Sequence, residues 1–409
     1  MEGKYNSASA RWAAVGPYYA MFPTSFADDV VARFTEPGDW VLDPFAGRGT
    51  AVYSAAIADR HGVGIELNPV GWLYGATKLG VAPRTRVDAR LGEIERAAPR
   101  RLSAATTLPE FFTWCFSDRV LAFLMTARSM LNWRASATDR TLMAFILVYL
   151  HGKHEASLSN QMRQTKAMAP RYAVNWWRER GLQPPALDPG EFLRDRIAWR
   201  YARGVPTVGH SHMFLGDCTR RIEGLALRWS ERKIQPARLL LTSPPYFRLT
   251  NYHYDQWLRL WMLGGSPTAN RLGEENRGKF EGRVAYSKLL VTAFRKASAY
   301  LAPDAVIYVR TGSRSVTYEA TNSALSQVFP NHRLVAEDRP YVRPTQTHLF
   351  GDHEPKVGEV DLVLRALNLV AHGVPFVSRE VPHHQTLGTS FSVPCRELWK
   401  VRSAIRLAA

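Results

Sequence analysis

In the first 83 residues and again after about residue 206, short apolar runs alternate with stretches of helical periodicity. Runs such as Trp40–Asp43 and Leu239–Thr242 are short and almost continuously apolar, which is typical of buried strands. Seven strands are predicted in this way, at residues 40–43, 62–67, 213–217, 239–242, 305–310, 333–337 and 358–365. Strands alternating with helices predict an α/β fold whose sheet is mostly parallel, and the last two strands can pair antiparallel.

The middle of the chain follows a different pattern. From about residue 84 to residue 205 glycines become rare, and apolar residues recur at helical spacing, as in Leu121, Leu124 and Leu131. We therefore predict one α/β domain made of residues 1–83 and 206–409, interrupted by a helical insertion at 84–205. The insertion carries 20 Lys and Arg against 11 Asp and Glu.

Composition adds constraints on partners and location. The net charge of the chain is +17, which favours a polyanionic partner, nucleic acid before a membrane. The three cysteines, Cys115, Cys218 and Cys395, form no CxxC pair, so a reducing compartment is expected. The first residues lack the apolar core of a signal peptide, and the longest apolar run, Leu142–Leu150, is too short to cross a bilayer. We expect a soluble, cytoplasmic protein.

A glycine-containing loop follows the first predicted strand. Asp43 ends the strand, and Gly47 and Gly49 precede an Ala-rich helix, so a ligand can approach the loop backbone and the helix N-terminus. Glu66 ends the next strand about 20 residues later, a spacing that suits an acid accepting hydrogen bonds from ribose hydroxyls. The loop is not a P-loop, and with two glycines it favours a nucleoside ligand smaller than a dinucleotide.

The strand at 239–242 runs into Ser243-Pro244-Pro245-Tyr246. The two prolines have no N–H group and a fixed φ, so the backbone past Ser243 is rigid and cannot continue a sheet ladder. Ligands of open α/β sheets bind at this end of the strands. A planar base could stack on Tyr246 while its amino group donates to the Ser243 hydroxyl and to the Ser243 and Pro244 carbonyls.

Together, the DPFAGRGT sequence of Asp43–Thr50 and the TSPPY sequence of Thr242–Tyr246 resemble the S-adenosylmethionine-dependent DNA amino-methyltransferases. The resemblance is to the SPPY branch, usually linked to N4 of cytosine. It covers roughly residues 15–80 and 210–367 and leaves out the insertion. It implies a seven-stranded, Rossmann-like methyltransferase sheet with one antiparallel strand as the catalytic domain. It also implies a protein of a bacterial or archaeal cell.

The resemblance also implies roles for individual residues. Ser243, Pro244, Pro245 and Tyr246 would bind the flipped target base. Glu66 would hold the ribose of S-adenosylmethionine, and Asp217 would contact its adenine amino edge. The full set implied for cofactor binding is Phe22, Thr24, Asp43, Phe45, Gly47, Gly49, Thr50, Glu66, Leu67, Asn68, Asp217 and Thr242.

The implied chemistry needs no covalent intermediate. An exocyclic amine is a poor nucleophile because its lone pair is delocalised into the ring, and hydrogen bonds to Ser243 and the adjacent carbonyl would localise that pair for in-line attack on the methyl group. Because the amine is inaccessible in a duplex, the base must be flipped or already unpaired. Cytosine is preferred to adenine because a Ser opens the motif; adenine, RNA and a non-catalytic nucleic-acid-binding relative remain alternatives.

The partner expected is double-stranded DNA. The basic insertion is a candidate recognition domain, and four residues are candidate DNA contacts: Arg163, Lys166, Arg171 and Arg248. A separately encoded restriction endonuclease is a possible partner, since no nuclease motif is apparent in this chain. No metal site is expected, because His210, His212 and Cys218 have no fourth ligand near them.

Overall fold

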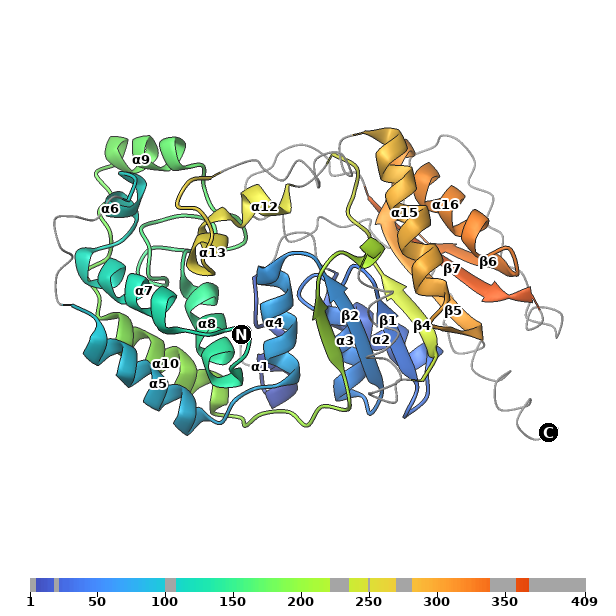
Figure 1. The fold of residues 1–409 in the computed structure, drawn as a ribbon, viewed down its shortest axis with the longest axis horizontal. Helices are drawn as coiled ribbons and strands as arrows, with labels where there is room; N and C mark the ends of the chain where they lie inside the picture. The colour runs from blue at the N-terminus through green and yellow to red at the C-terminus, as the bar shows by residue number, and fades with distance from the viewer. Residues whose placement is uncertain are drawn as a thin grey trace, which may run out of the picture.

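The structure is a computed structural model and describes residues 5–17, 22–99, 108–220, 235–248, 251–269, 282–338 and 358–367 (Figure 1). One sheet has the strand order β3-β2-β1-β4-β5-β7-β6. The strands are β1 Trp40–Asp43, β2 His61–Glu66, β3 His212–Leu215, β4 Ala237–Thr242, β5 Leu301–Gly312, β6 His332–Asp338 and β7 Glu359–Ala366. Only β7 runs antiparallel to its neighbours, β5 and β6. The predicted fold class, a Rossmann-like methyltransferase sheet, is confirmed.

Helices cover both faces of the sheet because its strands are apolar on both sides. Leu239 and Leu241 of β4 lie in one core cluster with residues of α2 (Thr24–Phe34) and α3 (Thr50–Ile57). Leu240, which points the other way, lies in a cluster with residues of α15 (Arg283–Ser298) and α16 (Ser315–Val328). Figure 1 shows α15 and α16 lying across the β4–β7 part of the sheet.

A helical body lies beside the sheet, beyond α4 (Figure 1). The helices described between residues 84 and 205 are α5 Arg84–Ala97, α6 Phe111–Cys115, α7 Asp118–Met130, α8 Ala137–Tyr149, α9 Pro170–Glu179 and α10 Pro189–Tyr201. Their core cluster also takes in residues of α4 (Pro69–Leu79) and of α13 (Trp257–Met262), the second of two short helices after the SPPY motif. The first of these is α12 (Tyr252–Asp255). None of the helices in the described ranges is long and apolar enough to cross a membrane.

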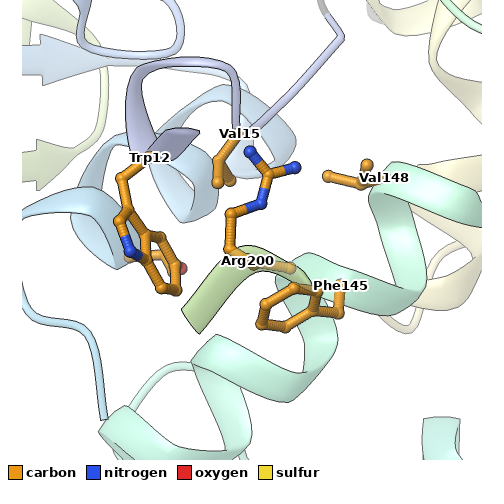
Figure 2. A pocket seen from close by; sticks show the side chains of 7 residues that line it. Trp12, Val15, Phe145, Val148 and Arg200 are labelled. Carbon is orange, nitrogen blue, oxygen red and sulfur yellow. The ribbon is translucent and has the colours of Figure 1, made fainter. Parts of the chain in front are cut away.

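The amino-terminal helix α1 (Ala8–Ala13) docks on α10. The Trp12 indole donates to the Gly204 carbonyl at 3.1 Å, and its ring meets the Tyr201 ring edge-on at 5.1 Å. Arg200 donates to the carbonyl of Arg11. Figure 2 shows the narrow, mostly apolar crevice that remains between α1, α8 and α10, with Arg200 in its wall. The amino-terminal segment therefore fastens the helical body to the sheet domain.

Several element bounds differ from the expected ones. The sequence of residues 254–263, with Trp257 and Trp261 four residues apart, predicts one helix. The structure instead has the two helices α12 and α13, with Gln256 between them. β3 ends at Leu215, two residues before Asp217, because the Asp217 carboxylate caps the next turn through the Thr219 N–H and hydroxyl at 2.8 and 2.7 Å. The sequence also predicts a basic helix from Asp217 to about Trp229. Its residues from 221 on lie outside the described ranges, as does Cys395.

Candidate active site

The loop after β1 presents bare backbone at the carboxyl edge of the sheet. Gly47 and Gly49 have φ values of 54° and 72°, a region that favours glycine. A Cβ added to Gly47 would meet no described heavy atom within 4 Å, so the space beside it is open. Gly49, the N-cap of α3, packs tightly on α4, since a Cβ there would lie 3.1 Å from the Gly75 Cα. A ligand can thus reach the loop at Gly47 while Gly49 keeps the loop fixed.

Glu66, at the end of β2, is bonded to this loop. Its Oε2 accepts the Gly47 N–H and its Oε1 accepts the Asn68 N–H, each at 2.7 Å. Burial raises the pKa of Glu66 to about 8, against the lowering effect of the two N–H groups. Each carboxylate oxygen has two lone pairs, so Glu66 retains the capacity to accept hydroxyl donors from a ligand. Asn68 in turn caps α4 by accepting the Val70 N–H at 3.0 Å.

Asp43 and Thr242 join the glycine loop to the SPPY motif. The strands β1 and β4 are parallel neighbours, so their carboxyl ends meet at one edge of the sheet. The Thr242 hydroxyl donates to Asp43 Oδ1 at 2.6 Å, and the Phe45 N–H donates to the same oxygen at 3.1 Å. Both side chains are buried, and burial raises the pKa of Asp43 to about 7. Two strand ends 199 residues apart in sequence are therefore in direct contact.

The SPPY residues come directly after β4. Pro244 is buried, whereas Ser243, Pro245 and Tyr246 are half-buried. The Tyr246 hydroxyl donates to Glu359 Oε1 at 3.0 Å, so the side chain reaches across β5 to β7. The motif therefore lies at the edge that carries the glycine loop, with its aromatic ring held between neighbouring strands.

The remaining predicted cofactor residues border this edge. Thr50 and Thr24 are the first residues of α3 and α2, and Phe22 packs in the core cluster between α2 and the sheet. Leu67 follows β2 and is 40% exposed, and Asp217 follows β3. Because β1 to β4 are parallel, the positions after these strands all face the same side of the molecule.

The four predicted DNA contacts lie in three segments. Lys166 forms an ion pair with Asp255 of α12 at 2.8 Å, and Arg163 precedes it by three residues. Arg171 is exposed on α9. Arg248, two residues past Tyr246, has a φ of 57°, and its guanidinium lies 5.2 Å from the centre of the Phe247 ring.

Hydrogen bonds to main-chain carbonyls tie the segment around Lys166 to the helices after the SPPY motif. Gln256 donates to the Thr165 carbonyl, Trp257 to the Met168 carbonyl, and the Ala167 N–H to the Asp255 carbonyl, each at 3.0 Å. The helix α12 begins six residues after Tyr246, a span of at most about 21 Å even when fully extended. The segment around Lys166 therefore lies within reach of the SPPY turn.

One residue of the glycine loop has a role that sequence reasoning missed. Arg48 is buried and donates to the carbonyls of Ala13, Val15 and Gly16 at 3.0, 3.3 and 3.1 Å, and burial lowers its pKa to about 10. It anchors the amino-terminal segment to the loop. No local signal distinguishes such a residue from an exposed arginine in a turn.

The cofactor half of the site has known relatives. Residues 2–70, which include the glycine loop and Glu66, match the model of a family described as DNA methylase. This segment resembles DNA methylases. Over 54 residues the chain is 48% identical to the Type II methyltransferase M.Cfr9I of Citrobacter freundii and 44% identical to M.XycI of Xanthomonas campestris pv. cyanopsidis. Each match covers 13% of this chain and 18% of the relative, so the chain spans less than a fifth of those relatives.

The match supports S-adenosylmethionine as the methyl donor, and the residues fit it: open space beside Gly47, bare loop backbone, and a carboxylate at the end of β2. Among solved structures, the rRNA methyltransferase aviRa from Streptomyces viridochromogenes is 13% identical, with a TM-score of 0.34, over 91% of this chain and 100% of its own. TrmN from Thermus thermophilus is 11% identical, with a TM-score of 0.32, over 87% and 52%.

Proposed function

We propose that this protein transfers the methyl group of S-adenosylmethionine to the exocyclic N4 amine of cytosine in double-stranded DNA. The observation that carries the proposal is the hydrogen bond from Thr242 to Asp43, because it brings the glycine loop and the SPPY turn to one edge of the sheet. The family match over residues 2–70 supports the cofactor half of the proposal, and the SPPY sequence supports the base half.

The glycine loop and Glu66 bind the cofactor in this proposal. The cofactor supplies an electrophilic methyl group on a sulfonium. The loop residues from Asp43 to Thr50 surround its amino-acid end, and Glu66 accepts hydrogen bonds from its ribose hydroxyls. Leu67, Asn68 and Asp217 border the adenine, with the Asp217 carboxylate accepting from the adenine amine.

The SPPY residues activate the target amine. The Ser243 hydroxyl and the carbonyls of Ser243 and Pro244 accept its hydrogen bonds, which favours a pyramidal nitrogen with a localised lone pair. The rigid Pro244-Pro245 backbone fixes these acceptors. Tyr246 supplies the stacking surface for a flipped base, and a base held next to the bound methyl donor would react faster through proximity and orientation.

The helical body recognises the duplex. Its net positive charge attracts the phosphate backbone, and the segment containing Arg163 and Lys166 lies within reach of the SPPY turn. Arg171 and Arg248 contribute further contacts to the phosphate backbone of the DNA. The chain acts in the cytoplasm, and any cleavage of unmethylated DNA belongs to a separate restriction endonuclease.

One experiment tests the chemistry directly. The purified protein is incubated with methyl-labelled S-adenosylmethionine and plasmid DNA from a host without DNA methyltransferases, and the digested nucleosides are identified by mass spectrometry. We expect label in N4-methylcytosine. Label in N6-methyladenine would refute the base assignment, label only when RNA replaces DNA would refute the substrate, and cofactor binding without transfer would indicate a non-catalytic relative.

A variant separates binding from chemistry. Ser243→Ala is expected to lower the rate of transfer at least about 100-fold, the usual loss when a transition-state hydrogen bond is removed, with an unchanged Kd for the cofactor. Ser298→Ala is the matched control, because the Ser298 hydroxyl only donates to the Arg295 carbonyl at the exposed end of α15. Equal losses of transfer and cofactor affinity in Ser243→Ala would contradict the assigned role.

A further inference from the structure

Tyr246 is held by groups on two strands that the SPPY motif does not include. Its hydroxyl donates to Glu359 Oε1 at 3.0 Å, and its ring lies against β5, where a Cβ added to Gly312 would be 3.4 Å from Tyr246 Cδ2. Gly312 and Glu359 face each other in the antiparallel ladder of β5 and β7. The tyrosine therefore crosses β5 at a residue without a side chain and ends on the residue paired with it.

The acceptor is itself held in place. Arg310 is fully buried and makes a bidentate pair with Asp361, Nε to Oδ1 at 2.6 Å and Nη2 to Oδ2 at 2.7 Å. Its remaining nitrogen, Nη1, lies 3.8 Å from Glu359 Oε2. The guanidinium also stacks on Phe26 of α2, 3.5 Å from the ring centre. Burial raises the pKa of Glu359, and Arg310 places a fixed positive charge beside it that opposes this rise and favours the carboxylate form that accepts from Tyr246.

We propose that Glu359 is a positioning residue that orients the Tyr246 ring for stacking on the target base, with Arg310 fixing Glu359. This inference rests on the proposed function, since it requires that Tyr246 contact the base. A tyrosine ring at the end of a turn loses rotamer freedom when it stacks, and a hydrogen bond that holds it beforehand reduces that loss. A positioning role requires that Glu359 affect transfer through the Tyr246 hydroxyl, so its effect must disappear when that hydroxyl is removed.

The test is a double-mutant cycle on transfer to plasmid DNA. Glu359→Ala and Tyr246→Phe should each lower kcat about tenfold, equivalent to about 1.4 kcal/mol, with the cofactor KM unchanged. The double variant should be no slower than either single variant, because both remove the same hydrogen bond. Glu359→Gln keeps an oxygen acceptor and should restore most of the rate.

Glu337→Ala is the matched control. Glu337 on β6 accepts from the Tyr318 hydroxyl of α16 at 2.9 Å, so its removal breaks the same kind of pair in the same sheet away from the SPPY turn. Thermal unfolding of each variant checks that the fold persists, as Arg310 keeps its bidentate partner when Glu359 is removed. Additive losses, an unaffected Glu359→Ala, or an equal loss in Glu337→Ala would overturn the positioning role alone. An inactive wild-type protein would overturn the proposed function itself, and the positioning role with it.

Discussion

Replacing Thr242 by valine tests the contact that joins the two halves of the site. The two side chains have nearly the same shape, so the substitution removes a hydroxyl without opening a cavity in a position that is fully buried. Asp43 Oδ1 then keeps only the Phe45 N–H, at 3.1 Å. A hydrogen bond to a charged group contributes about 1.5–3 kcal/mol and one to a neutral group about 1 kcal/mol, so the loss depends on the ionisation of Asp43.

The pH dependence follows from the pKa of Asp43, which burial raises to about 7 in the folded protein. In an unfolded chain the pKa of this group is about 3.8, so between pH 3.8 and pH 7 the folded state binds more protons and its stability falls as pH rises. The Thr242 hydroxyl lowers the folded pKa, and Thr242→Val raises it further. The variant should therefore be less stable than wild type by about 1 kcal/mol at pH 6 and by about 2 kcal/mol at pH 9.

Urea unfolding at the two pH values, followed by tryptophan fluorescence, measures this difference. Thr77→Val is the control, because Thr77 is fully buried in α4 and its hydroxyl has no hydrogen-bond partner among the described residues. That variant should be neutral or slightly stabilising at both pH values. A Thr242→Val loss of equal size at pH 6 and pH 9 would refute the reasoning, since it would show that the hydroxyl does not distinguish the two forms of Asp43.

Two further predictions concern ligand binding. In Gly71→Ala the new Cβ would lie 2.8 Å from the Gly47 carbonyl oxygen, so α4 must shift away from the glycine loop. Titration calorimetry should show the Kd for S-adenosylmethionine raised by about tenfold or more. An unchanged Kd would contradict a cofactor site at this loop. Lys166→Ala takes the ion-pair partner from Asp255, whose side chain is 5% exposed, so stability should fall by more than the roughly 1 kcal/mol of an exposed pair. The slope of log K for DNA against log salt should become shallower by about one.

The strands and the glycine loop could be predicted because their signals are local. Trp40–Asp43 is a strand with the predicted bounds, and a run of apolar residues closed by Asp-Pro carries that information within a few positions. The positive φ values of Gly47 and Gly49 are also a local matter, since only glycine adopts them without strain. Asp43 and Thr242 could be placed at one edge of the sheet from the resemblance, but the hydrogen bond between them is a finding of the structure.

Contacts between distant segments had no such signal. Tyr246 and Glu359 are 113 residues apart, and Glu359 is one carboxylate among many at the start of a strand. Glu359 meets Tyr246 because β7 lies antiparallel beside β5. The sequence predicted only that the last two strands can pair with each other, not that β7 also pairs with β5. From the sequence alone, Arg310 could equally be an exposed residue at the end of a strand. In the structure it is fully buried and paired with Asp361.

Arg259 of α13 joins this short helix to the helical body. This residue is fully buried and donates to the carbonyls of Leu147 and Gln164 and to the Gln256 side chain, at 2.8, 2.5 and 2.7 Å. Removing any one of these acceptors would leave a buried cation short of partners, which is costly, so α8, the segment around Gln164 and α13 must move as one unit. Under the proposed function, a duplex bound by the segment of Arg163 and Lys166 would be held by the same unit as α13, which begins eleven residues after Tyr246 in the chain. In that proposal, the packing around Arg259 is what sets the distance between the recognised sequence and the target base.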